Sequence, residues 1–233
     1  MIGHNHLGKN GRFGNQMFQY AATRGLAAKH KYDWCIPDGP RTDEEFVDEE
    51  NQHKLFMAFK MEGAKVVKDH PAPYEKEGSF TFDHRLFLYC PDNVNLFGYF
   101  QCEKYFKDIE KEIRQDFTWR DDVRSLCQDM FDSIGGKAIS LHIRRTDHLV
   151  KPTYHPVLPL SYYEKALEII DTLSLDRQKN LPVLVFSDDP EWCHKQEFFS
   201  DDRFMISDSG DNITDMCLMS MCQYQIMANS TFS

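Results

Sequence analysis

Short apolar stretches alternate with amphipathic ones along most of the chain, and their spacing predicts strands that alternate with helices. In the first half we expect short strands at residues 2–7 and 94–100. Residues 15–30 place small and apolar side chains near the 3.6-residue period of a helix. A second helix is expected at residues 103–117, where two phenylalanines and two isoleucines recur at helical spacing.

The second half of the chain repeats this alternation more regularly. A helix is expected directly after Arg120, and a proline-rich loop at residues 151–160 leads to a helix that we expect Ser161 to cap. The other expected strands lie at residues 137–143, 181–187, 203–207 and 224–228, and the other expected helices at 162–173, 190–199 and 211–222. Strands separated by helices are typical of parallel β-α-β units. We therefore predict an α/β protein of two halves, joined near residue 119.

The composition limits the class of protein. The 233 residues are 41% hydrophobic, enough for one large or two small domains. A net charge of −10 argues against nucleic acid as the main partner, because such binding depends on clustered Lys and Arg. We find no apolar stretch near the ~20 residues of a transmembrane helix and no signal-peptide core. Seven cysteines without a C-x-x-C pair suit a reducing compartment, so we expect a cytoplasmic protein, or one bound peripherally to a membrane.

The first polar cluster is the turn G-R-F-G-N-Q at residues 11–16, which enters the first expected helix. Glycines such as Gly11 and Gly14 let backbone amides approach an anion, and a helix N-terminus adds partial positive charge. G-x-x-G turns are common, however, and the alternative is an ordinary turn with Asn15 as the helix cap.

The second cluster is H-I-R-R-T-D at residues 142–147, at the end of an expected strand. Side chains alternate between the faces of a strand, so His142 and Arg144 should point to one face and Arg145 to the other. One arginine can then reach into a cleft while its neighbour pairs with a carboxylate. A guanidinium suits phosphate because it donates in a planar fork and keeps its charge. The alternative is a surface strand end with a solvated ion pair.

Two further clusters follow other expected strands. A-N-S-T-F at residues 228–232 offers hydroxyl and amide donors that suit phosphate oxygens, or it is a capping sequence. Asp188 and Asp189 follow the strand at 181–187, where a carboxylate could accept hydrogen bonds from a base or a ribose. Asp189 is also the expected cap of a helix that starts at Pro190.

Certain arrangements are missing from the sequence. It contains no Asp-x-Asp, no G-x-x-x-x-G-K-[ST] loop and no zinc-type spacing of cysteines and histidines. If a diphosphate binds, we expect arginine, backbone amides and hydroxyls to neutralise it without a metal or another cofactor.

Five segments taken together resemble the α-1,2-fucosyltransferases of glycosyltransferase family 11, in the order of that family and across nearly the whole chain. They are G-R-F-G-N-Q-M-F-Q-Y-A (11–21), G-Y-F-Q-C-E-K-Y-F (98–106), H-I-R-R-T-D (142–147), V-F-S-D-D-P-E-W-C (185–193) and D-M-C-L-M-S-M-C…I-M-A-N-S-T-F-S (215–233). Each segment alone is a weak signal, but their order is specific.

The resemblance implies an α/β protein of the GT-B type, in which two Rossmann-like halves face each other across a cleft. Residues 1–118 would form the acceptor side, and residues 119–233 would bind GDP-fucose. The implied reaction is an inverting, metal-independent transfer of L-fucose to the 2-hydroxyl of a galactose-type acceptor. We expect the acceptor glycan to be bound by N-terminal loops such as 36–54 and 70–80.

The resemblance also implies roles for individual residues. The implied donor-binding residues are Gly11, Arg12, Gly14, Asn15, His142, Arg144, Asp188, Asp189, Asn229, Ser230, Thr231 and Phe232. Arg144 would clamp the β-phosphate, the hydroxyls at 230 and 231 would reach the phosphates, and the ring at 232 would lie against the nucleotide. One of the two aspartates would contact guanine or ribose.

The catalytic base stays open. Asp147 is the nearest carboxylate, but it could equally hold one of the arginines. Asn15 could orient the acceptor but cannot take a proton near neutral pH. A highly dissociative transition state would need no strong base. The catalytic candidates are therefore Arg144, Asp147 and Asn15.

Two departures from the family pattern are visible. Thr146 replaces a glycine and His148 replaces a tyrosine in the second cluster, and the sequence ends at Ser233 before the family's usual W-W-G segment and final helix. The alternatives that we keep are another GDP-fucose transfer, to a protein hydroxyl or to a sugar 6-hydroxyl, and a catalytically silent nucleotide-sugar-binding protein.

Overall fold

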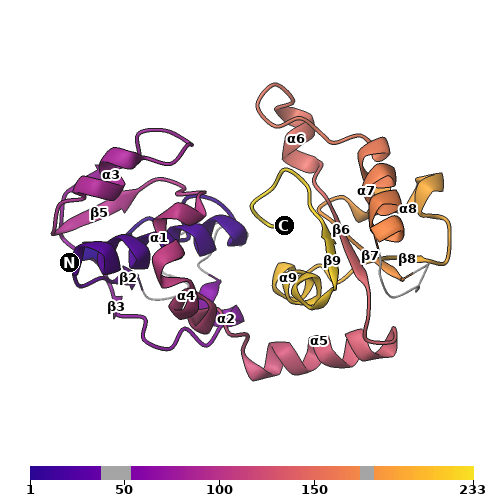
Figure 1. The fold of residues 1–233 in the computed structure, drawn as a ribbon, viewed down its shortest axis with the longest axis horizontal. Helices are drawn as coiled ribbons and strands as arrows, with labels where there is room; N and C mark the ends of the chain where they lie inside the picture. The colour runs from indigo at the N-terminus through magenta and orange to yellow at the C-terminus, as the bar shows by residue number, and fades with distance from the viewer. Residues whose placement is uncertain (38–53, 174–180) are drawn as a thin grey trace. The chain divides into compact units, whose positions relative to one another are not determined.

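The computed structural model describes residues 1–37, 54–173 and 181–233. It forms two compact units, Met1–Arg120 and Asp121–Thr231, which we call the N-terminal and C-terminal units (Figure 1). None of the helices in the described ranges combines the length and the apolar composition needed to cross a membrane.

The N-terminal unit contains two small parallel sheets. One has the order β1-β5-β4, with β1 (Ile2–Gly3), β5 (Val94–Phe97) and β4 (Tyr74–Lys76), and the other pairs β2 (Ile36–Pro37) with β3 (Val66–Val67). These strands are two to four residues long, too short to show a clear alternation of apolar and polar positions. That is why β2, β3 and β4 were not predicted, and the expected strand at 2–7 is only the two residues of β1.

Helix α1 (Phe13–His30) supplies much of the core of this unit. Its apolar face, with Ala22 and Leu26, packs in one cluster with Ile2 and Leu96 of the sheet. The helix ends where Lys31 adopts a left-handed conformation with φ 58°, and the amide of this residue donates to the last carbonyls of the helix. The predicted helix at 15–30 is thus confirmed, with a start two residues earlier.

The predicted helix at 103–117 is wrong in its first half. The chain instead forms two 3₁₀ turns, Glu103–Tyr105 and Lys107–Ile109, before α4 (Glu110–Asp116). The backbone breaks at Phe106, whose φ is −133°. This segment packs directly on α1: an ideal Cβ on Gly25 would lie 2.2 Å from the Tyr105 carbonyl oxygen and 2.7 Å from the Phe106 Cα. Tertiary packing therefore decides the local conformation.

The remaining elements of the N-terminal unit are α2 (Leu55–Ala58) and α3 (His84–Tyr89). Asp83 caps α3 by accepting from the amide of Leu86 at 2.9 Å. Of the two expected acceptor loops, 70–80 contains β4, and 36–54 begins with β2 while its residues 38–53 lie outside the described residues.

The C-terminal unit is a four-stranded parallel sheet with the order β8-β7-β6-β9. The strands are β6 (Ile139–Ile143), β7 (Val183–Ser187), β8 (Phe204–Ile206) and β9 (Tyr224–Ile226). All four were predicted, each two residues longer than it is in the structure. Every residue of β6 is buried, as expected for a strand covered on both faces.

Helices cover both faces of this sheet. Figure 1 shows α7 (Leu160–Leu173) and α8 (Pro190–His194) on one side of the strands and α9 (Asn212–Met221) on the other, and α9 packs on α5 (Asp121–Ser133). Because α7 begins at Leu160, Ser161 lies inside its first turn, and the predicted cap is wrong. The predicted helix at 190–199 is α8 followed by a 3₁₀ turn, Glu197–Phe199.

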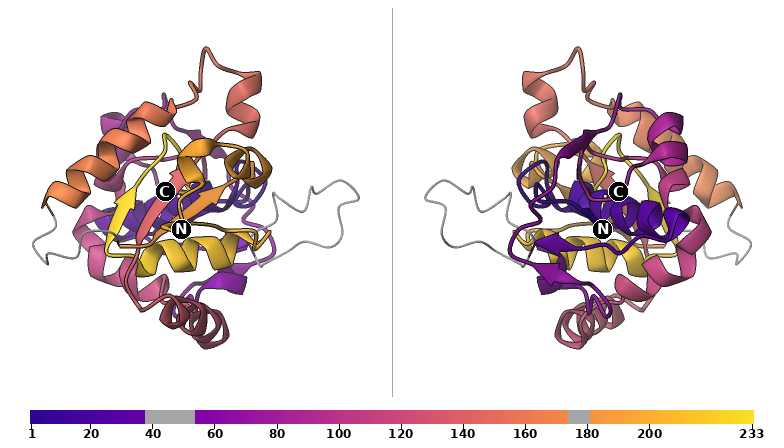
Figure 2. Two further views of the ribbon diagram at one scale, coloured as in Figure 1. Left: turned by 90° about the vertical axis from the view of Figure 1, so that its right-hand side faces the viewer. Right: turned by 90° about the vertical axis from the view of Figure 1, so that its left-hand side faces the viewer.

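The short helix α6 (Thr146–Val150) was not predicted, and neither were α2 and α3 in the N-terminal unit. It follows β6 directly, and Figures 1 and 2 show it and the loop after it projecting from the rest of the C-terminal unit in every view. Val150 and Tyr154 in this projection are largely exposed.

We expect Gly25→Ala to destabilise the protein, although alanine is the better helix former by about 1 kcal/mol. The added methyl group would meet backbone atoms of residues 105 and 106, which cannot turn aside. The expected loss is about 1–3 kcal/mol of unfolding free energy in urea denaturation. The control is Ala28→Gly at an exposed position of α1, which should lose about 1 kcal/mol through helix propensity alone. An alanine variant as stable as the native protein would contradict this packing role.

Candidate functional site

The C-terminal sheet brings the polar segments that follow its strands to one edge. β6 and β7 are parallel neighbours with Ile143 opposite Ser187, and β9 pairs with the other side of β6. The segments that begin at residues 144, 188 and 227 therefore leave the sheet along one edge. Ligands of open α/β sheets bind beyond the carboxyl ends of the strands, so this edge is the candidate site.

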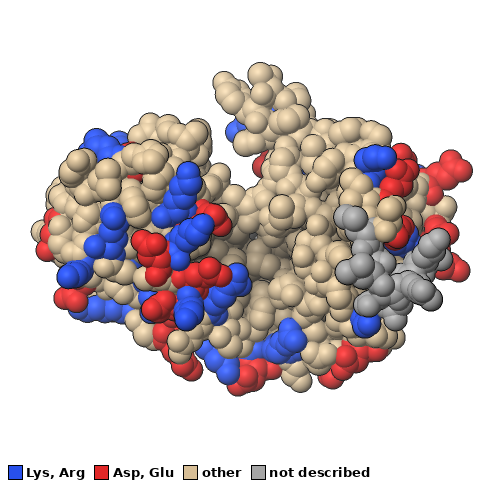
Figure 3. Space-filling view, viewed as in Figure 1, with Lys and Arg blue, Asp and Glu red and all other residues tan. Residues whose placement is uncertain are grey.

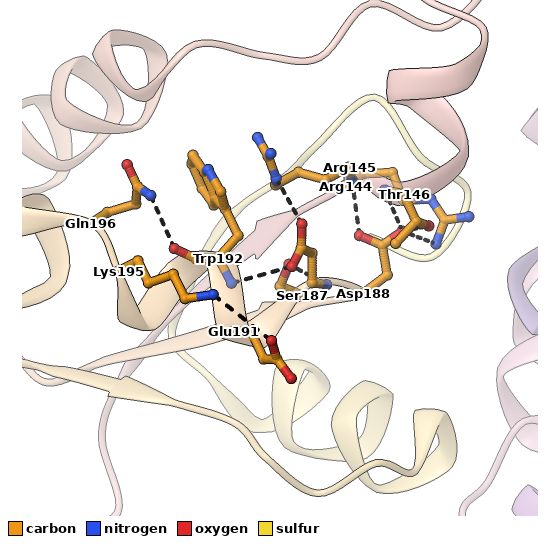
Figure 4. Close-up of polar contacts among 10 residues, drawn as sticks. Arg144, Arg145, Thr146, Ser187, Asp188, Glu191, Trp192, Lys195 and Gln196 are labelled. Carbon is orange, nitrogen blue, oxygen red and sulfur yellow. Dashed lines mark hydrogen bonds and ion pairs between the residues drawn. The ribbon is translucent and has the colours of Figure 1, made fainter.

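The register of β6 and β7 continues past the ends of both strands. Arg144 pairs with Asp188 at 3.0 Å, and Arg145 pairs with Asp189 at 3.1 Å. Two consecutive arginines thus meet two consecutive aspartates. Figure 4 shows the side chains of Arg144 and Arg145 pointing in different directions, as expected from strand alternation.

Arg144 is held between two carboxylates. Its Nη2 lies 2.7 Å from Asp147 and its Nη1 lies 3.0 Å from Asp188. The guanidinium side chain is 13% exposed, while that of Asp147, three residues further on α6, is 49% exposed. Two roles were left open for Asp147, that of a base and that of a partner for an arginine. In the structure it is the partner of Arg144.

Asp188 also organises the backbone after β6. Its carboxylate accepts from the amide of Arg145 at 2.8 Å and from the amide of Thr146 at 3.2 Å, and it also accepts from the Thr146 hydroxyl. Figure 4 shows these bonds converging on one side chain. Thr146, at the position where the resembled family has glycine, therefore takes part in fixing the first turn of α6.

Arg145 belongs to a second contact group on α8. Its guanidinium lies 3.7 Å from the centre of the Trp192 ring, and its Nε donates to Asp189. Asp189 in turn caps α8, because it accepts from the amide of Trp192 at 3.2 Å. The proline at the first turn of α8 follows this aspartate, which is the expected capping arrangement.

His142 is buried at the end of β6. Burial, helped by the positive charge of Arg144, lowers its pKa from the usual 6.5 to about 4. The imidazole is therefore neutral near pH 7. Further along, His148 is also buried, and burial lowers its pKa. Its ring stacks on that of His155, with the ring centres 5.0 Å apart, so His148, at the position where the resembled family has tyrosine, packs against the loop after α6.

The segment after β9 is tied to the loop before α7. The Asn229 side chain donates to the carbonyl of Pro156 at 2.9 Å, and the Tyr162 hydroxyl donates to the carbonyl of Met227 at the same distance. Asn229, expected among the donor-binding residues, uses its amide here to position the segment that carries Ser230 and Thr231.

The turn at residues 11–14 lies in the N-terminal unit. Gly11 has φ +88°, and a Cβ there would also collide with the Asn15 side chain. Asn15 lies inside α1 and accepts from Gln101 at 2.7 Å, while the residue at the cap position of the helix is Arg12. The alternative interpretation of Asn15 as the cap is therefore wrong.

Three residues that are not among the predicted site residues make specific contacts, two in the N-terminal unit and one in the C-terminal unit. Gln19 donates to the carbonyls of Asn10 and Gly98, at 2.9 and 3.1 Å. Gln16 accepts from the amide of Lys54 at 2.9 Å. Both glutamines are fully buried, and their position on the core face of α1 was the signal that could have identified them. The stacking of Trp192 on Arg145 had no counterpart in the sequence pattern.

At the ends of β6 and β7 the structure brings together three of the predicted residues in one group and a fourth in an adjacent ion pair. Arg144, Asp147 and Asp188 are in direct contact, and Arg145 and Asp189 form the neighbouring pair. Within residues 1–37, 54–173 and 181–233, no three histidine, cysteine or acidic side chains lie where they could hold a metal ion. Figure 3 shows basic and acidic side chains interspersed on the face of the N-terminal unit seen there.

We expect Arg145→Ala to lower the unfolding free energy by about 1–3 kcal/mol, because it removes both the stack on Trp192 and the ion pair with Asp189. Arg145→Lys should recover only part of this loss, since an ammonium cannot stack as a plane. The control is Lys165→Ala, which breaks an exposed pair with Glu168 and should change stability by less than about 1 kcal/mol. Urea denaturation measures all three, and an alanine variant at position 145 with native stability would refute the assignment.

His142 predicts a pH dependence of stability. Its pKa is about 4 in the folded protein and near 6.5 in the unfolded chain, so the unfolded state binds more protons below pH 6.5. The unfolding free energy should therefore fall as the pH is lowered through this window. Between pH 7 and pH 5 the native protein should lose about 2 kcal/mol more than His142→Gln. Urea denaturation at both pH values tests this, and equal losses in the two proteins would rule it out.

Comparison with known proteins identifies the family. The sequence profile of glycosyl transferase family 11 matches residues 1–233. An α-1,2-colitosyltransferase from Escherichia coli is 28% identical over 96% of this chain and 83% of its own length. The rat (Rattus norvegicus) galactoside α-(1,2)-fucosyltransferase 1 is 25% identical, over 95% of this chain and 60% of its own length.

A solved structure shares the fold. The NodZ α-1,6-fucosyltransferase co-crystallized with GDP has a TM-score of 0.61 at 14% identity, covering 99% of this chain and 89% of that protein. Together with the two parallel α/β units, this likeness confirms the expected GT-B fold class with its Rossmann-like halves. Because the family profile spans residues 1–233, the chain belongs to glycosyltransferase family 11 and is a glycosyltransferase.

Proposed function

We propose that this protein transfers L-fucose from GDP-fucose to the 2-hydroxyl of a galactose-type acceptor, with inversion and without a metal ion. The observation that carries the proposal is the nearly buried guanidinium of Arg144, fixed by two carboxylates at the carboxyl edge of a parallel sheet in a family 11 chain. The relatives named for α-1,2 transfer support the linkage, and the GDP complex of NodZ supports the nucleotide.

In the proposed reaction the bond between fucose and GDP breaks, and negative charge grows on the β-phosphate. A cation already held in place stabilises this charge more in the transition state than in the ground state. Arg144 meets that requirement because residues of two different strand ends orient it. The metal-free reaction is part of the proposal, in which the guanidinium does the work of a divalent cation.

Other residues complete the proposed donor site. His142, neutral near pH 7, would lie beside the diphosphate or base as a hydrogen-bonding group. Ser230 and Thr231 would donate to the phosphates, with Phe232 against the nucleotide and Asp188 or Asp189 on the nucleoside. The turn residues Gly11, Arg12, Gly14 and Asn15 stay predicted donor-binding residues on the resemblance to the family alone.

The proton acceptor stays open in this proposal. Asp147 is half-exposed and pairs with Arg144 at 2.7 Å, which supports a role as counter-ion. It would be a base only if the ion pair opened in the donor complex. Asn15 could orient the acceptor hydroxyl without taking its proton.

We also propose that the enzyme works in the cytoplasm or peripherally on a membrane, and its seven cysteines, all free thiols, support a reducing compartment.

A second candidate is transfer of a related sugar or to a different acceptor. The relative named α-1,2-colitosyltransferase carries a donor sugar other than fucose in its name, and NodZ is named for α-1,6 transfer. A silent nucleotide-sugar binder would bind GDP and transfer nothing. The identity of the donor and the identity of the acceptor therefore have to be tested in separate experiments.

Calorimetry with GDP, UDP and CMP in the presence of EDTA tests the donor class, and we expect binding of GDP alone. Transfer assays with GDP-fucose and other GDP-sugars, on galactosides and on a folded protein acceptor, should give an α-1,2-fucosylated galactoside. Arg144→Ala should keep the fold and lower turnover by at least about 10²-fold, the usual effect of losing one such donor. Binding of UDP in place of GDP, a need for metal, or an active Arg144→Ala enzyme would each contradict the proposal.

A further inference from the structure

We propose that Asp188 is a positioning residue: it acts on the donor through Arg144 and does not bind the nucleoside. This inference rests on the proposed function, because it assumes that Arg144 is the phosphate clamp. It gives Asp188 a role different from the guanine or ribose contact that the family resemblance implies.

The first argument is the acceptor capacity of the carboxylate. An ionised carboxylate offers about four lone-pair directions. Protein donors take up most of this capacity in Asp188: the amide and hydroxyl of Thr146 and Arg144 Nη1 all lie on Oδ2, and the amide of Arg145 takes one of the two lone-pair directions of Oδ1. The side chain is also only 15% exposed. Beyond the second direction on Oδ1, a nucleoside would have to displace donors that the fold supplies.

The second argument is what those donors have in common. All of them belong to three consecutive residues, 144–146, at the point where β6 ends and α6 begins. Asp188 lies on the neighbouring strand end and therefore ties the direction of the arginine to the frame of the sheet. Asp147, by contrast, lies on α6 and is much more exposed. It belongs to the same segment as Arg144, so it cannot fix that segment relative to the sheet.

The third argument is the different use of the next aspartate. Asp189 caps α8 and pairs with Arg145, on the other side of the strand. The two carboxylates are thus divided between the two arginines. Only the one at position 188 contacts the guanidinium that we place on the phosphate.

The experiment compares Asp188→Asn with the native enzyme, using GDP and guanosine as probes. If Asp188 acts through Arg144, the variant should bind GDP at least about tenfold more weakly, because the clamp has lost its fixed partner. It should bind guanosine within about twofold of the native value. The kcat for transfer should fall by about 10²-fold and by more than KM changes, because the lost alignment matters most in the transition state.

A double variant provides the decisive readout. In an Arg144→Ala background, Asp188→Asn should cause no further loss of GDP affinity or turnover, since two residues that act as one unit are not additive. The control is Asp171→Asn, which disrupts the bidentate ion pair with Arg203, with distances of 2.6 and 2.9 Å. This pair lies in the same unit but away from the edge of the sheet that carries Arg144. The control variant should lose stability but keep the native kcat and GDP affinity.

Equal losses for guanosine and GDP, an additive double variant, or native kcat in Asp188→Asn would each overturn the positioning role. These outcomes differ from failure of the proposed function. A native protein that binds GDP but transfers no sugar refutes the transfer reaction, while the comparison of GDP with guanosine still decides the role of Asp188. A native protein that binds no GDP overturns both.

Discussion

The candidate site depends on one constraint, the parallel pairing of β6 and β7 in a single register. That pairing sets Ile143 opposite Ser187, and the same register then sets Arg144 beside Asp188 and Arg145 beside Asp189. Strand alternation separates the two pairs onto opposite faces. Arg145 is thereby stacked on Trp192 of α8. Arg144 is held at the carboxyl end of the strands, the edge at which ligands of open α/β sheets bind.

The charge at this edge shapes what the site can do. Two guanidinium groups meet three carboxylates there, those of residues 147, 188 and 189. A diphosphate bound as we propose would meet a site whose positive charge is already compensated, so its affinity would come from the geometry of individual donors more than from net charge. Asp147 is the most exposed of the three carboxylates, and its bond to Arg144 Nη2 is the one that an anionic ligand can replace with the least change in the fold.

The elements that could be predicted from the sequence are those whose conformation is determined by their own residues. The apolar runs of β6, β7 and β9 and the Asp-Pro start of α8 are local signals, and all of them appear in the structure. The failures have tertiary causes. The helix expected at 103–117 breaks because the chain must pass over Gly25, and the five residues of α6 are organised by a carboxylate some forty residues further along the chain.

The same distinction explains how far the site could be predicted. The divergence of Arg144 and Arg145 followed from alternation within one strand, and the cap at Asp189 followed from the proline after it. The pairing of Arg144 with Asp188 could not be predicted in this way. Only Asp147 is close to Arg144 in sequence, and the register of β6 on β7 is a property of the folded sheet. Once that register is known, R-R and D-D form two matched pairs across neighbouring strands, and Asp188 is the partner of Arg144. A motif at a strand end therefore has to be interpreted with its neighbour: here the phosphate clamp that we propose is formed by two strands, and one of its parts is an acid.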